Sequence, residues 1–343
     1  MGKIFKKNKV FFIAEMSSNH QNNFNKAKNI IREISKTGAD AIKFQTFIPE
    51  EMTLNTNNKK FVINEQSSLW KGKKLYDLYK ESSMKWEWQS KLFLFARKCG
   101  LIPFSSPFGE LSVKFLIKQK SRIFKIASLE NSHFPLLKLV SKTKKPIILS
   151  TGSASEKEVI ESVKYLRKNG CKDLTILKCT SVYPANFEDL NLMGIPYLKK
   201  KFKCRVGFSD HSKGIVSALT AIALGAEVIE KHVKLNKNDK SLDSEFSITV
   251  KEFKELINKA DDVKKSMGKK FFLTNSEKYA KSRRRSLIAT KNIKKNSKFT
   301  KNNIGVLRPN IGLHPKYYDE VIGKTAKSFI KMGSPIILNS LKK

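Results

Sequence analysis

Two of the five histidines in this 343-residue chain follow short apolar segments that are typical of strands. His211 comes after GFSD and His232 after VIEK, and the two segments are consecutive in the predicted order of strands. Neighbouring strands of a sheet lie about 5 Å apart. These imidazoles could therefore share one divalent metal ion and leave positions for water and a substrate. A histidine that is simply packed in the protein explains each residue alone equally well.

Three lysines, Lys43, Lys125 and Lys231, also lie inside apolar strand segments. A buried lysine stays charged when an anion is close to it. The carboxylates that could supply this anion within the protein are Glu15, Asp210 and Glu230. A phosphate or carboxylate group of a substrate could also supply it, and both explanations can hold together.

Apolar, β-branched segments of strand length alternate with amphipathic stretches along most of the chain. Strands are predicted to begin at Val10, Ala41, Leu101, Ile123, Pro146, Leu174, Cys204 and Glu227. Predicted helices include Asn25–Lys36, Trp86–Lys98, Glu156–Lys168 and Gly214–Leu224. Glycines at positions 38, 100, 170 and 225 stand where a helix ends and the next strand begins. Eight strand-then-helix units predict an α/β fold, the (β/α)8 or TIM barrel.

The active site of such a barrel is built at the C-terminal ends of its strands. The polar residues predicted there are Glu15, Lys43, Gln45, Ser105, Ser106, Lys125, Ser128, Glu130, Ser150, Thr151, Thr180, Ser181, Tyr183, Ser209, Asp210, His211, Glu230 and His232. A ring of strand ends that is polar throughout favours an anion-binding site.

Residues 1–264 carry the barrel pattern, residues 265–283 form a predicted polar linker, and residues 284–343 form a small domain with short predicted strands at 286–290, 298–300 and 303–309. A domain of about sixty residues is marginal alone, so we expect it to lean on the barrel or on a second subunit. Residues 47–85 form a long excursion between the second and third strands, with Trp70, Tyr76 and Tyr79. These aromatics indicate either a lid or, as the simpler interpretation, a packed subdomain.

The formal net charge is +38, a value that a nucleic-acid-binding protein could share. The lysines are spread along the chain, so a solvated surface that attracts anionic substrates is the favoured interpretation, and no nucleic-acid partner is expected. No apolar segment is long enough for a membrane helix, and Glu15 interrupts the apolar start of the chain before it resembles a signal peptide. The four cysteines form no C-x-x-C pair, which fits a cytoplasmic protein.

The motifs that carry these residues resemble the sialic acid synthase family over nearly the whole chain. They are AEMSSNH at 14–20, GADAIKFQTF at 38–47, FKIAS at 124–128, LSTG at 149–152, KCTSVYP at 178–184, GFSDH at 207–211 and IEKH at 229–232. The segment LRPNIGLHPKYYDEVIGK at 307–324 is similar to that family's C-terminal antifreeze-like (SAF) domain. The resemblance implies a transferase that condenses phosphoenolpyruvate with an acetamido sugar.

The resemblance also implies roles for individual residues. His211 and His232 match ligands of a divalent metal, expected to be manganese, with magnesium and cobalt as alternatives. Positions matching the phosphoenolpyruvate site are Lys43, Ser106, Lys125, Ser128, Ser150, Ser181 and Ser209, and positions near the metal or the acceptor are Glu15, Gln45, Tyr183 and Asp243. Glu130 matches a carboxylate that helps to activate water, and the expected catalytic residues are Glu15, Glu130, Lys43 and Lys125. Arg308 matches an arginine that reaches into the barrel of a partner subunit, which implies a domain-swapped homodimer.

Within the family, four segments resemble the pseudaminic acid branch, whose acceptor is 2,4-diacetamido-2,4,6-trideoxy-altrose: SLWKGKKLYDLYKES at 68–82, KWEW at 85–88, SSPF at 105–108 and GLHPKYY at 312–318. Asn310, Gly109, Leu242 and Ser153 replace a glycine, an aspartate, a proline and a methionine that are common at these positions, and they bear on the acceptor more than on the reaction. Open alternatives are N-acetylmannosamine or the legionaminic acid precursor as acceptor, a synthase that uses a sugar phosphate, and an inactive scaffold.

Overall fold

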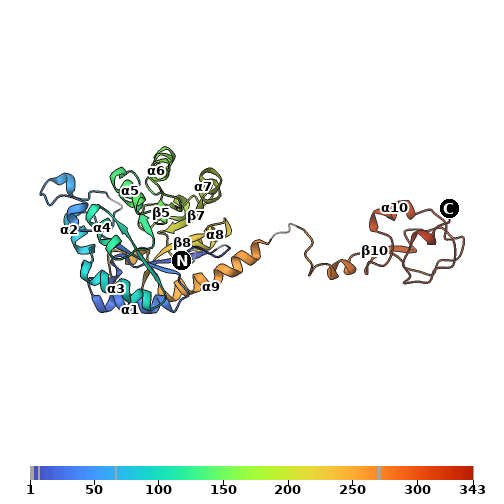
Figure 1. The fold of residues 1–343 in the computed structure, drawn as a ribbon. Coiled ribbons are helices and arrows are strands. Elements are labelled where there is room, and N and C mark those ends of the chain that lie inside the picture. The colour runs from blue at the N-terminus through green and yellow to red at the C-terminus, as the bar shows by residue number, and fades with distance from the viewer. Residues whose placement is uncertain (1–3, 7, 66–67, 269–271, 343) are drawn as a thin grey trace. The chain divides into compact units, whose positions relative to one another are not determined.

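A computed structural model describes residues 4–6, 8–65, 68–268 and 272–342 of the chain. The chain divides into two compact units, Met1–Met267 and Gly268–Lys343. The first unit holds the long helices and parallel strands, and the second is a small unit of short strands and turns (Figure 1). The predicted linker at 265–283 includes the end of helix α9 (Val250–Met267) and a 3-10 helix at Tyr279–Arg283, and its residues 269–271 lie outside the described residues.

Within the described residues, eight parallel strands close into a barrel. They are β1 (Phe11–Glu15), β2 (Ala41–Thr46), β3 (Ile102–Pro107), β4 (Phe124–Ile126), β5 (Ile147–Ser150), β6 (Leu174–Cys179), β7 (Arg205–Asp210) and β8 (Val228–Lys234). Each strand pairs with the next, and β1 also pairs with β8, where Glu15 lies opposite His232. A short strand β9 (Ile248–Thr249) pairs with the end of β8. The predicted TIM barrel is confirmed, and every predicted strand begins within one residue of an observed strand.

Helices follow the strands and surround the barrel (Figure 1). In the first unit they are α1 (Phe24–Ser35), α2 (Leu75–Ser82), α3 (Trp86–Lys98), α4 (Glu110–Lys118), α5 (Phe134–Lys142), α6 (Glu156–Lys168), α7 (Gly194–Phe202), α8 (Val216–Ala223) and α9. The bounds predicted for α3 and α6 are those observed, and the predictions for α1 and α8 are within two residues. The four glycines predicted at helix ends have φ between 82° and 104°, which is the left-handed conformation that glycine adopts without strain.

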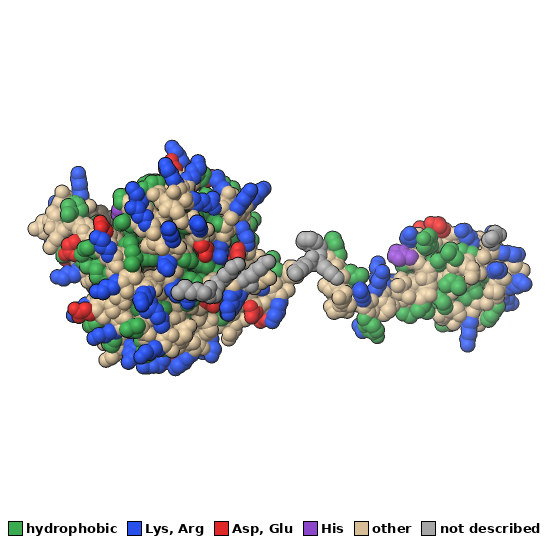
Figure 2. Space-filling view, in the orientation of Figure 1, with side chains coloured by type: hydrophobic (Ala, Val, Ile, Leu, Met, Phe, Trp, Pro, Cys, Tyr) green, Lys and Arg blue, Asp and Glu red, His purple; other side chains and the backbone are tan. Residues whose placement is uncertain are grey.

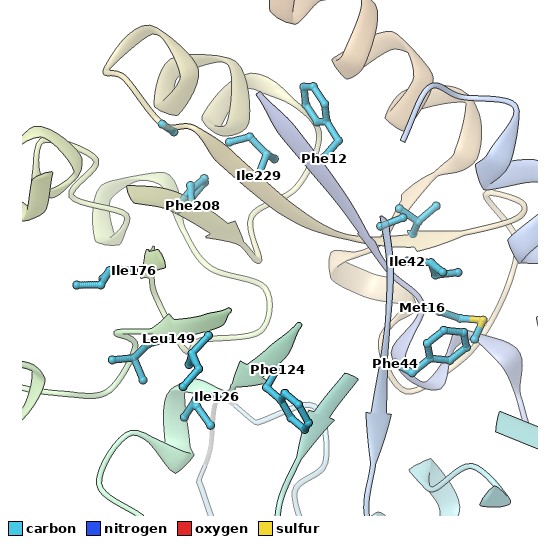
Figure 3. Close-up of a cluster of buried hydrophobic side chains, with 14 of the residues drawn as sticks. Phe12, Met16, Ile42, Phe44, Phe124, Ile126, Leu149, Ile176, Phe208 and Ile229 are labelled. Atoms are coloured by element: carbon cyan, nitrogen blue, oxygen red, sulfur yellow. The ribbon is translucent and has the colours of Figure 1, made fainter. Parts of the chain in front are cut away.

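Side chains that alternate along the strands form two separate buried layers. Outward-facing residues such as Phe12, Phe44, Phe208 and Ile229 belong to the layer between the barrel and its helices (Figure 3). Inward-facing residues near the N-terminal ends of the strands fill the bottom of the barrel, and they are Phe11, Ile13, Ala41, Phe104, Ile123, Ile148, Leu177 and Val228. The next inward-facing positions, toward the C-terminal ends, are polar. The barrel therefore offers an apolar floor and a polar site above it.

The excursion predicted at 47–85 is anchored to the barrel through its aromatic residues. The ring of Phe47 lies 6.1 Å from that of Tyr79 and 5.3 Å from that of Phe108, measured between centroids. The hydroxyl of Tyr76 donates to Glu50 Oε1 at 2.6 Å. Tyr79 therefore packs on Phe47, and Tyr76 holds Glu50 within the excursion.

The second unit pairs strand β10 (Ser286–Ala289) with β11 (Ile304–Leu307) in antiparallel orientation. Its own core includes Leu287, Phe299 and Ile336, and a short helix α10 (Tyr318–Val321) follows. The segment 298–300, predicted as a strand, makes an isolated bridge between Lys298 and Thr325. The small β-containing domain predicted after the barrel is confirmed, with shorter strands than expected.

Lysine and arginine side chains are scattered over the visible face of the first unit and do not gather in one patch (Figure 2). The four cysteines are free thiols. In the part of the chain that the structure describes, no helix combines the length and the apolar character needed to cross a bilayer.

Candidate active site

Two lysines and two glutamates form a buried cluster just above the apolar floor of the barrel. Lys43 Nζ lies 2.6 Å from Glu15 Oε2 and 3.5 Å from Glu230 Oε1. Lys125 Nζ lies 3.9 Å from the same oxygen of Glu230. All four side chains are buried. The carboxylate partners that the sequence allowed for are therefore present, and Glu230 links the two lysines.

Burial and neighbouring charges act in opposite directions on the pKa values of this cluster. Burial raises the pKa of Glu15 to about 7, although Lys43 acts to lower it. Burial also lowers the pKa of Lys125. For Lys43, the effect of burial is outweighed by Glu15 and Glu230, which raise its pKa, and for Glu230 it is outweighed by Lys125 and Lys43, which lower its pKa. Near neutral pH, Glu15 is therefore partly protonated, which weakens its attraction for Lys43.

Serine hydroxyls surround the lysines, as the motifs predicted. Lys125 Nζ donates to Ser150 Oγ at 2.6 Å, and Lys43 Nζ lies 3.5 Å from Ser106 Oγ. These hydroxyls belong to strands β5 and β3. The lysines thus have neutral partners that can be exchanged for a substrate oxygen without leaving a buried charge unpaired.

Gly152 allows two further predicted serines to come close together. A Cβ atom at this position would lie 2.2 Å from Ser181 Oγ and 2.7 Å from Ser128 Oγ, and the amide of Gly152 donates to Ser128 Oγ at 3.1 Å. Ser209 Oγ donates to Glu230 Oε1 at 3.2 Å. Among the described residues, Ser181 Oγ is buried without a hydrogen-bond partner. The site therefore requires glycine at 152 and keeps one hydroxyl available for a ligand.

His211 and His232 face each other at the ends of β7 and β8, with ring centroids 5.4 Å apart. His211 Nδ1 lies 2.9 Å from the carbonyl oxygen of Thr180, which leaves Nε2 for a ligand. His232 Nδ1 has no hydrogen-bond partner among the described residues and lies 4.0 Å from Asp243 Oδ2. Burial lowers the pKa of His232 well below its usual value, so this imidazole is neutral, as a metal ligand must be.

The surroundings of the two histidines fit a catalytic metal ion with an open coordination sphere. In the described residues, no group of three or more histidine, cysteine, aspartate or glutamate side chains is arranged to hold a metal ion. Two imidazoles alone would leave coordination positions of a metal ion open to oxygens of water and substrate, as in catalytic metal sites. Among the described residues, Glu15 Oε1 and Glu230 Oε2 are buried without a hydrogen-bond partner. Burial lowers the pKa of His211, but Cys179 and the Thr180 carbonyl outweigh burial and raise the pKa overall.

Tyr183 and Phe246 form an aromatic layer beside the histidines. The ring of Tyr183 lies 4.5 Å from that of His211 and 5.0 Å from that of Phe246. The ring of Phe246 lies 4.8 Å from that of His232. The end of the site that holds the two histidines therefore has an apolar side, which the sequence did not indicate for Phe246.

The other predicted site residues occupy several places in the chain. Asp243, in the loop after β8, accepts hydrogen bonds from the amide and the hydroxyl of Ser18 at 3.0 and 2.7 Å. Gln45 is the next inward-facing position after Lys43 on β2. Glu130 ends a 3-10 turn after β4, and burial raises its pKa to about 7. Arg308 belongs to the second unit, where it is exposed directly after β11.

Asp210 does not line the site, contrary to the prediction from its place at a strand end. It is the register partner of Lys231, and their side chains form an ion pair of 2.9 Å on the outer face of β7 and β8. The reason is the alternation of side chains along a strand, which turns Asp210 outward between Ser209 and His211. Asp210 is one of the carboxylates that the sequence indicated as possible partners of a buried lysine, and it pairs with Lys231.

Glu230 is a central residue of the site, which the sequence placed at a strand end as a possible partner of the lysines but without a catalytic or binding role. It contacts both buried lysines, whereas Glu15 contacts Lys43. The signal was available, because Glu230 precedes His232 by two positions on the same strand and must therefore face the same side.

A closed (β/α)8 barrel with lysines, carboxylates and a histidine pair at its C-terminal end defines an enzyme that binds a small anionic substrate. Residues 30–271 match the NeuB family, and residues 284–342 match the SAF domain. The chain therefore belongs to the NeuB family, which confirms the resemblance to sialic acid synthases.

Individual relatives are similar over nearly their whole length. The chain is 43% identical over 330 residues to a pseudaminic acid synthase of Campylobacter jejuni, covering 96% of this chain and 95% of that protein. It is 38% identical over 327 residues to an N,N'-diacetyllegionaminic acid synthase of the same species, with 93% and 96% covered. The solved structure of an N-acetylneuraminic acid synthetase from Leptospira borgpetersenii in complex with citrate has a TM-score of 0.70 and 32% identity, covering 80% of this chain and 90% of that one.

Proposed function

We propose that the chain is a pseudaminic acid synthase, which condenses phosphoenolpyruvate with 2,4-diacetamido-2,4,6-trideoxy-altrose to give pseudaminic acid and phosphate. The observation that carries this proposal is the pair of buried lysines joined by Glu230, with His211 and His232 one step further along the strands. The lysines suit the phosphate and carboxylate of phosphoenolpyruvate. The 43% identity to a pseudaminic acid synthase supports this acceptor. N-acetylmannosamine and the legionaminic acid precursor are the alternatives.

The reaction forms one carbon–carbon bond and one carbon–oxygen bond to water, and it breaks the carbon–oxygen bond to the phosphate. The methylene carbon of phosphoenolpyruvate attacks the aldehyde carbon of the open-chain sugar, and water adds to the resulting cationic carbon. The tetrahedral intermediate then expels phosphate and becomes a ketone. Lys43 and Lys125 hold the anionic groups and place the methylene against the aldehyde, so that positioning supplies much of the rate.

Two carboxyl groups with raised pKa values serve the proton transfers. Glu130, whose pKa is raised to about 7 by burial, accepts a proton from the attacking water. Glu15, which also has a pKa of about 7 because burial outweighs the effect of Lys43, supplies the proton that the former aldehyde oxygen takes up. A pKa close to the working pH suits both roles.

His211 and His232 hold a divalent metal ion in this proposal, with manganese as the first choice and magnesium or cobalt as alternatives. When bound, such an ion polarises and orients the aldehyde oxygen. The contact of His211 Nδ1 with the Thr180 carbonyl would orient that ring, while Asp243 Oδ2, 4.0 Å from His232 Nδ1, places a carboxylate beside the second ring.

A domain-swapped homodimer is part of the proposal, with Arg308 of one subunit reaching into the barrel of the other. Arg308 is exposed between two exposed apolar residues, Leu307 at 43% and Ile311 at 52%. Mixing an Arg308→Ala protein with a His211→Ala protein tests this arrangement. If sites are shared between subunits, a mixed dimer contains one complete site, and the mixture should recover activity that neither variant has alone.

The primary test is phosphate release from phosphoenolpyruvate with manganese, with and without EDTA. The acceptors to compare are 2,4-diacetamido-2,4,6-trideoxy-altrose, N-acetylmannosamine and the legionaminic acid precursor. We expect release with the altrose, and we expect EDTA to remove it. A clear preference for another acceptor would contradict the proposed substrate, and no release with any of them would contradict the proposed reaction.

A further inference from the structure

Trp70 lies at one end of a small, bridged loop within the excursion between β2 and α2. Val62 and Lys74 form an antiparallel bridge at the base of this loop. Above it, the amide of Gly72 donates to the carbonyl of Ile63 at 2.8 Å, and the amide of Lys73 donates to that of Trp70 at 3.1 Å. Hydrogen bonds between described residues therefore hold the backbone at the base of the loop and next to Trp70.

The partner of the indole is a residue of the candidate active site. The ring of Trp70 lies 5.9 Å from that of Tyr183, at an angle of 45°. Tyr183 in turn lies 4.5 Å from His211 and 5.0 Å from Phe246, measured between ring centroids. Trp70 thus extends the aromatic layer of the site, from the metal-binding histidines outward to the excursion.

The two other tryptophans of the chain have a different environment. Trp86 packs on Phe115 of α4 at 4.8 Å, and its indole donates to the carbonyl of Phe47. Trp88 packs on Phe24 of α1 at 5.9 Å. Both belong to α3 and pack in the layer of helices outside the barrel. Their contacts are those of ordinary packing, whereas Trp70 contacts a site residue.

The site has two chemically different parts, the lysine and glutamate cluster and the aromatic rings beside the histidines. The lysines and serines are suited to phosphate and carboxylate groups. Indole and phenol rings are suited to apolar groups and to the faces of planar amides. A sugar with a methyl group at C6 and two acetamido groups presents such surfaces, whereas a sugar with a hydroxymethyl group and one acetamido group presents fewer of them.

We propose that Trp70 is a specificity-determining residue, which forms with Tyr183 the apolar wall of the acceptor subsite and packs against the methyl and acetamido groups of a 6-deoxy diacetamido sugar. This inference rests on the proposed function for the identity of the acceptor. Trp70 takes no part in binding phosphoenolpyruvate, which lies at the lysines.

The test compares Trp70→Ala and Trp70→Phe with Trp88→Phe as a matched control that changes a tryptophan outside the site. Rates of phosphate release give kcat and KM for the acceptor at saturating phosphoenolpyruvate, and the KM for phosphoenolpyruvate separately. Loss of the aromatic contact with the acceptor should raise the acceptor KM of Trp70→Ala by about tenfold to a hundredfold. Trp70→Phe should show a smaller rise, and the KM for phosphoenolpyruvate should change by less than about twofold. The preference for the altrose over N-acetylmannosamine should fall by a similar factor.

A Trp70→Ala protein with the acceptor KM of the wild type would overturn the inference, and so would an equal rise in both KM values, because a merely structural role would disturb both substrates. If the wild type prefers another acceptor, the proposed function fails. The role of Trp70 is then tested by the effect of Trp70→Ala on the KM of that acceptor. Intrinsic fluorescence gives a readout without turnover. The acceptor should quench it in the wild type and in Trp88→Phe but not in Trp70→Phe, and no quenching with any acceptor would also overturn the inference.

Discussion

Asp210 and Lys231 form a fully buried ion pair of 2.9 Å on the face of β7 and β8 opposite to His211 and His232. The carboxylate of Asp210 also accepts hydrogen bonds from the amide of Ser212 at 2.8 Å and from the hydroxyl of Ser217, at the start of α8, at 2.8 Å. Each member of the pair directly precedes one of the histidines. The pair therefore ties together the two strand ends that carry the proposed metal ligands.

Removing one member of this pair should cost much more stability than removing both. Lys231→Met leaves a buried carboxylate without its cation, and such a change costs about 3 to 5 kcal/mol of unfolding free energy. The double variant Lys231→Met with Asp210→Asn should recover part of this loss, because no charge is left unpaired. Urea unfolding measures both. The control is Lys114→Met, which breaks an exposed pair with Glu110 and should cost less than about 1 kcal/mol. Equal losses in the single and double variants would contradict this account.

Glu51 caps helix α4 from another part of the chain. Its Oε1 atom accepts hydrogen bonds from the amides of Leu111 at 2.7 Å and Ser112 at 3.2 Å. Gly109, at the N-cap position itself, leaves room for this carboxylate, since a Cβ atom there would lie 2.3 Å from Glu51 Oε1. An aspartate at the N-cap would bond the same amides from within the helix. The glycine at 109 therefore has a local structural explanation.

This exchange of one cap for another predicts a coupled pair of substitutions. Glu51→Ala should destabilise the protein by about 1 kcal/mol, the usual cost of losing an N-cap. Gly109→Asp should also destabilise it, because the new side chain forces the carboxylate of Glu51 to move and places a second negative charge beside it. The double variant should be more stable than Gly109→Asp alone, since Asp at 109 can then act as the cap. Thermal unfolding of the four proteins forms a double-mutant cycle, and simple additivity would show that the two positions are independent.

The sequence was sufficient for the barrel because its strands and helices are specified locally. Apolar β-branched segments and glycines at helix ends placed every strand start within one residue. The error at Asp210 and the missing role for Glu230 have one cause. The prediction did not separate the residues at a strand end by the face of the strand on which they lie. Alternation along β8 puts Glu230 and His232 on one face and Lys231 on the other, and it could have been applied to the sequence.

Other features depend on contacts that the sequence does not contain. Trp70 and Tyr183 are separated by more than a hundred positions, and no local pattern predicts that their rings meet. The same holds for Glu51 and Leu111, because the cap comes from a different segment than the helix. The raised pKa of Glu130 follows from burial, which is known once the chain is folded.

Glu130→Gln should make the enzyme less active but more stable at alkaline pH. The pKa of Glu130 is raised to about 7 from 4.5, so the folded protein holds this proton more tightly than the unfolded chain does. The contribution of Glu130 to stability is therefore most favourable below pH 4.5 and is lost as the pH rises to about 7. Glutamine does not titrate. The unfolding free energy of the variant minus that of the wild type should therefore be larger at pH 8 than at pH 5. Urea unfolding at both pH values measures this gain, with Glu110→Gln as an exposed control. A variant with full activity would contradict the catalytic role of Glu130.

His211→Ala should abolish metal-dependent turnover while leaving the barrel folded. Changes in outer partners of metal ligands already cost about tenfold to a hundredfold in metal affinity or activity, so the loss of a ligand should cost at least about a hundredfold in phosphate release. Since His211 contacts the carbonyl of Thr180 through Nδ1 and the rings of Tyr183, His232 and Phe246 through its imidazole, alanine removes contacts within the site and leaves the core intact. Manganese binding by calorimetry, phosphate release and far-ultraviolet circular dichroism separate these effects, with the exposed His314→Ala as the control. A His211→Ala protein that still turns over normally after chelation would show that the two histidines do not bind a catalytic metal ion.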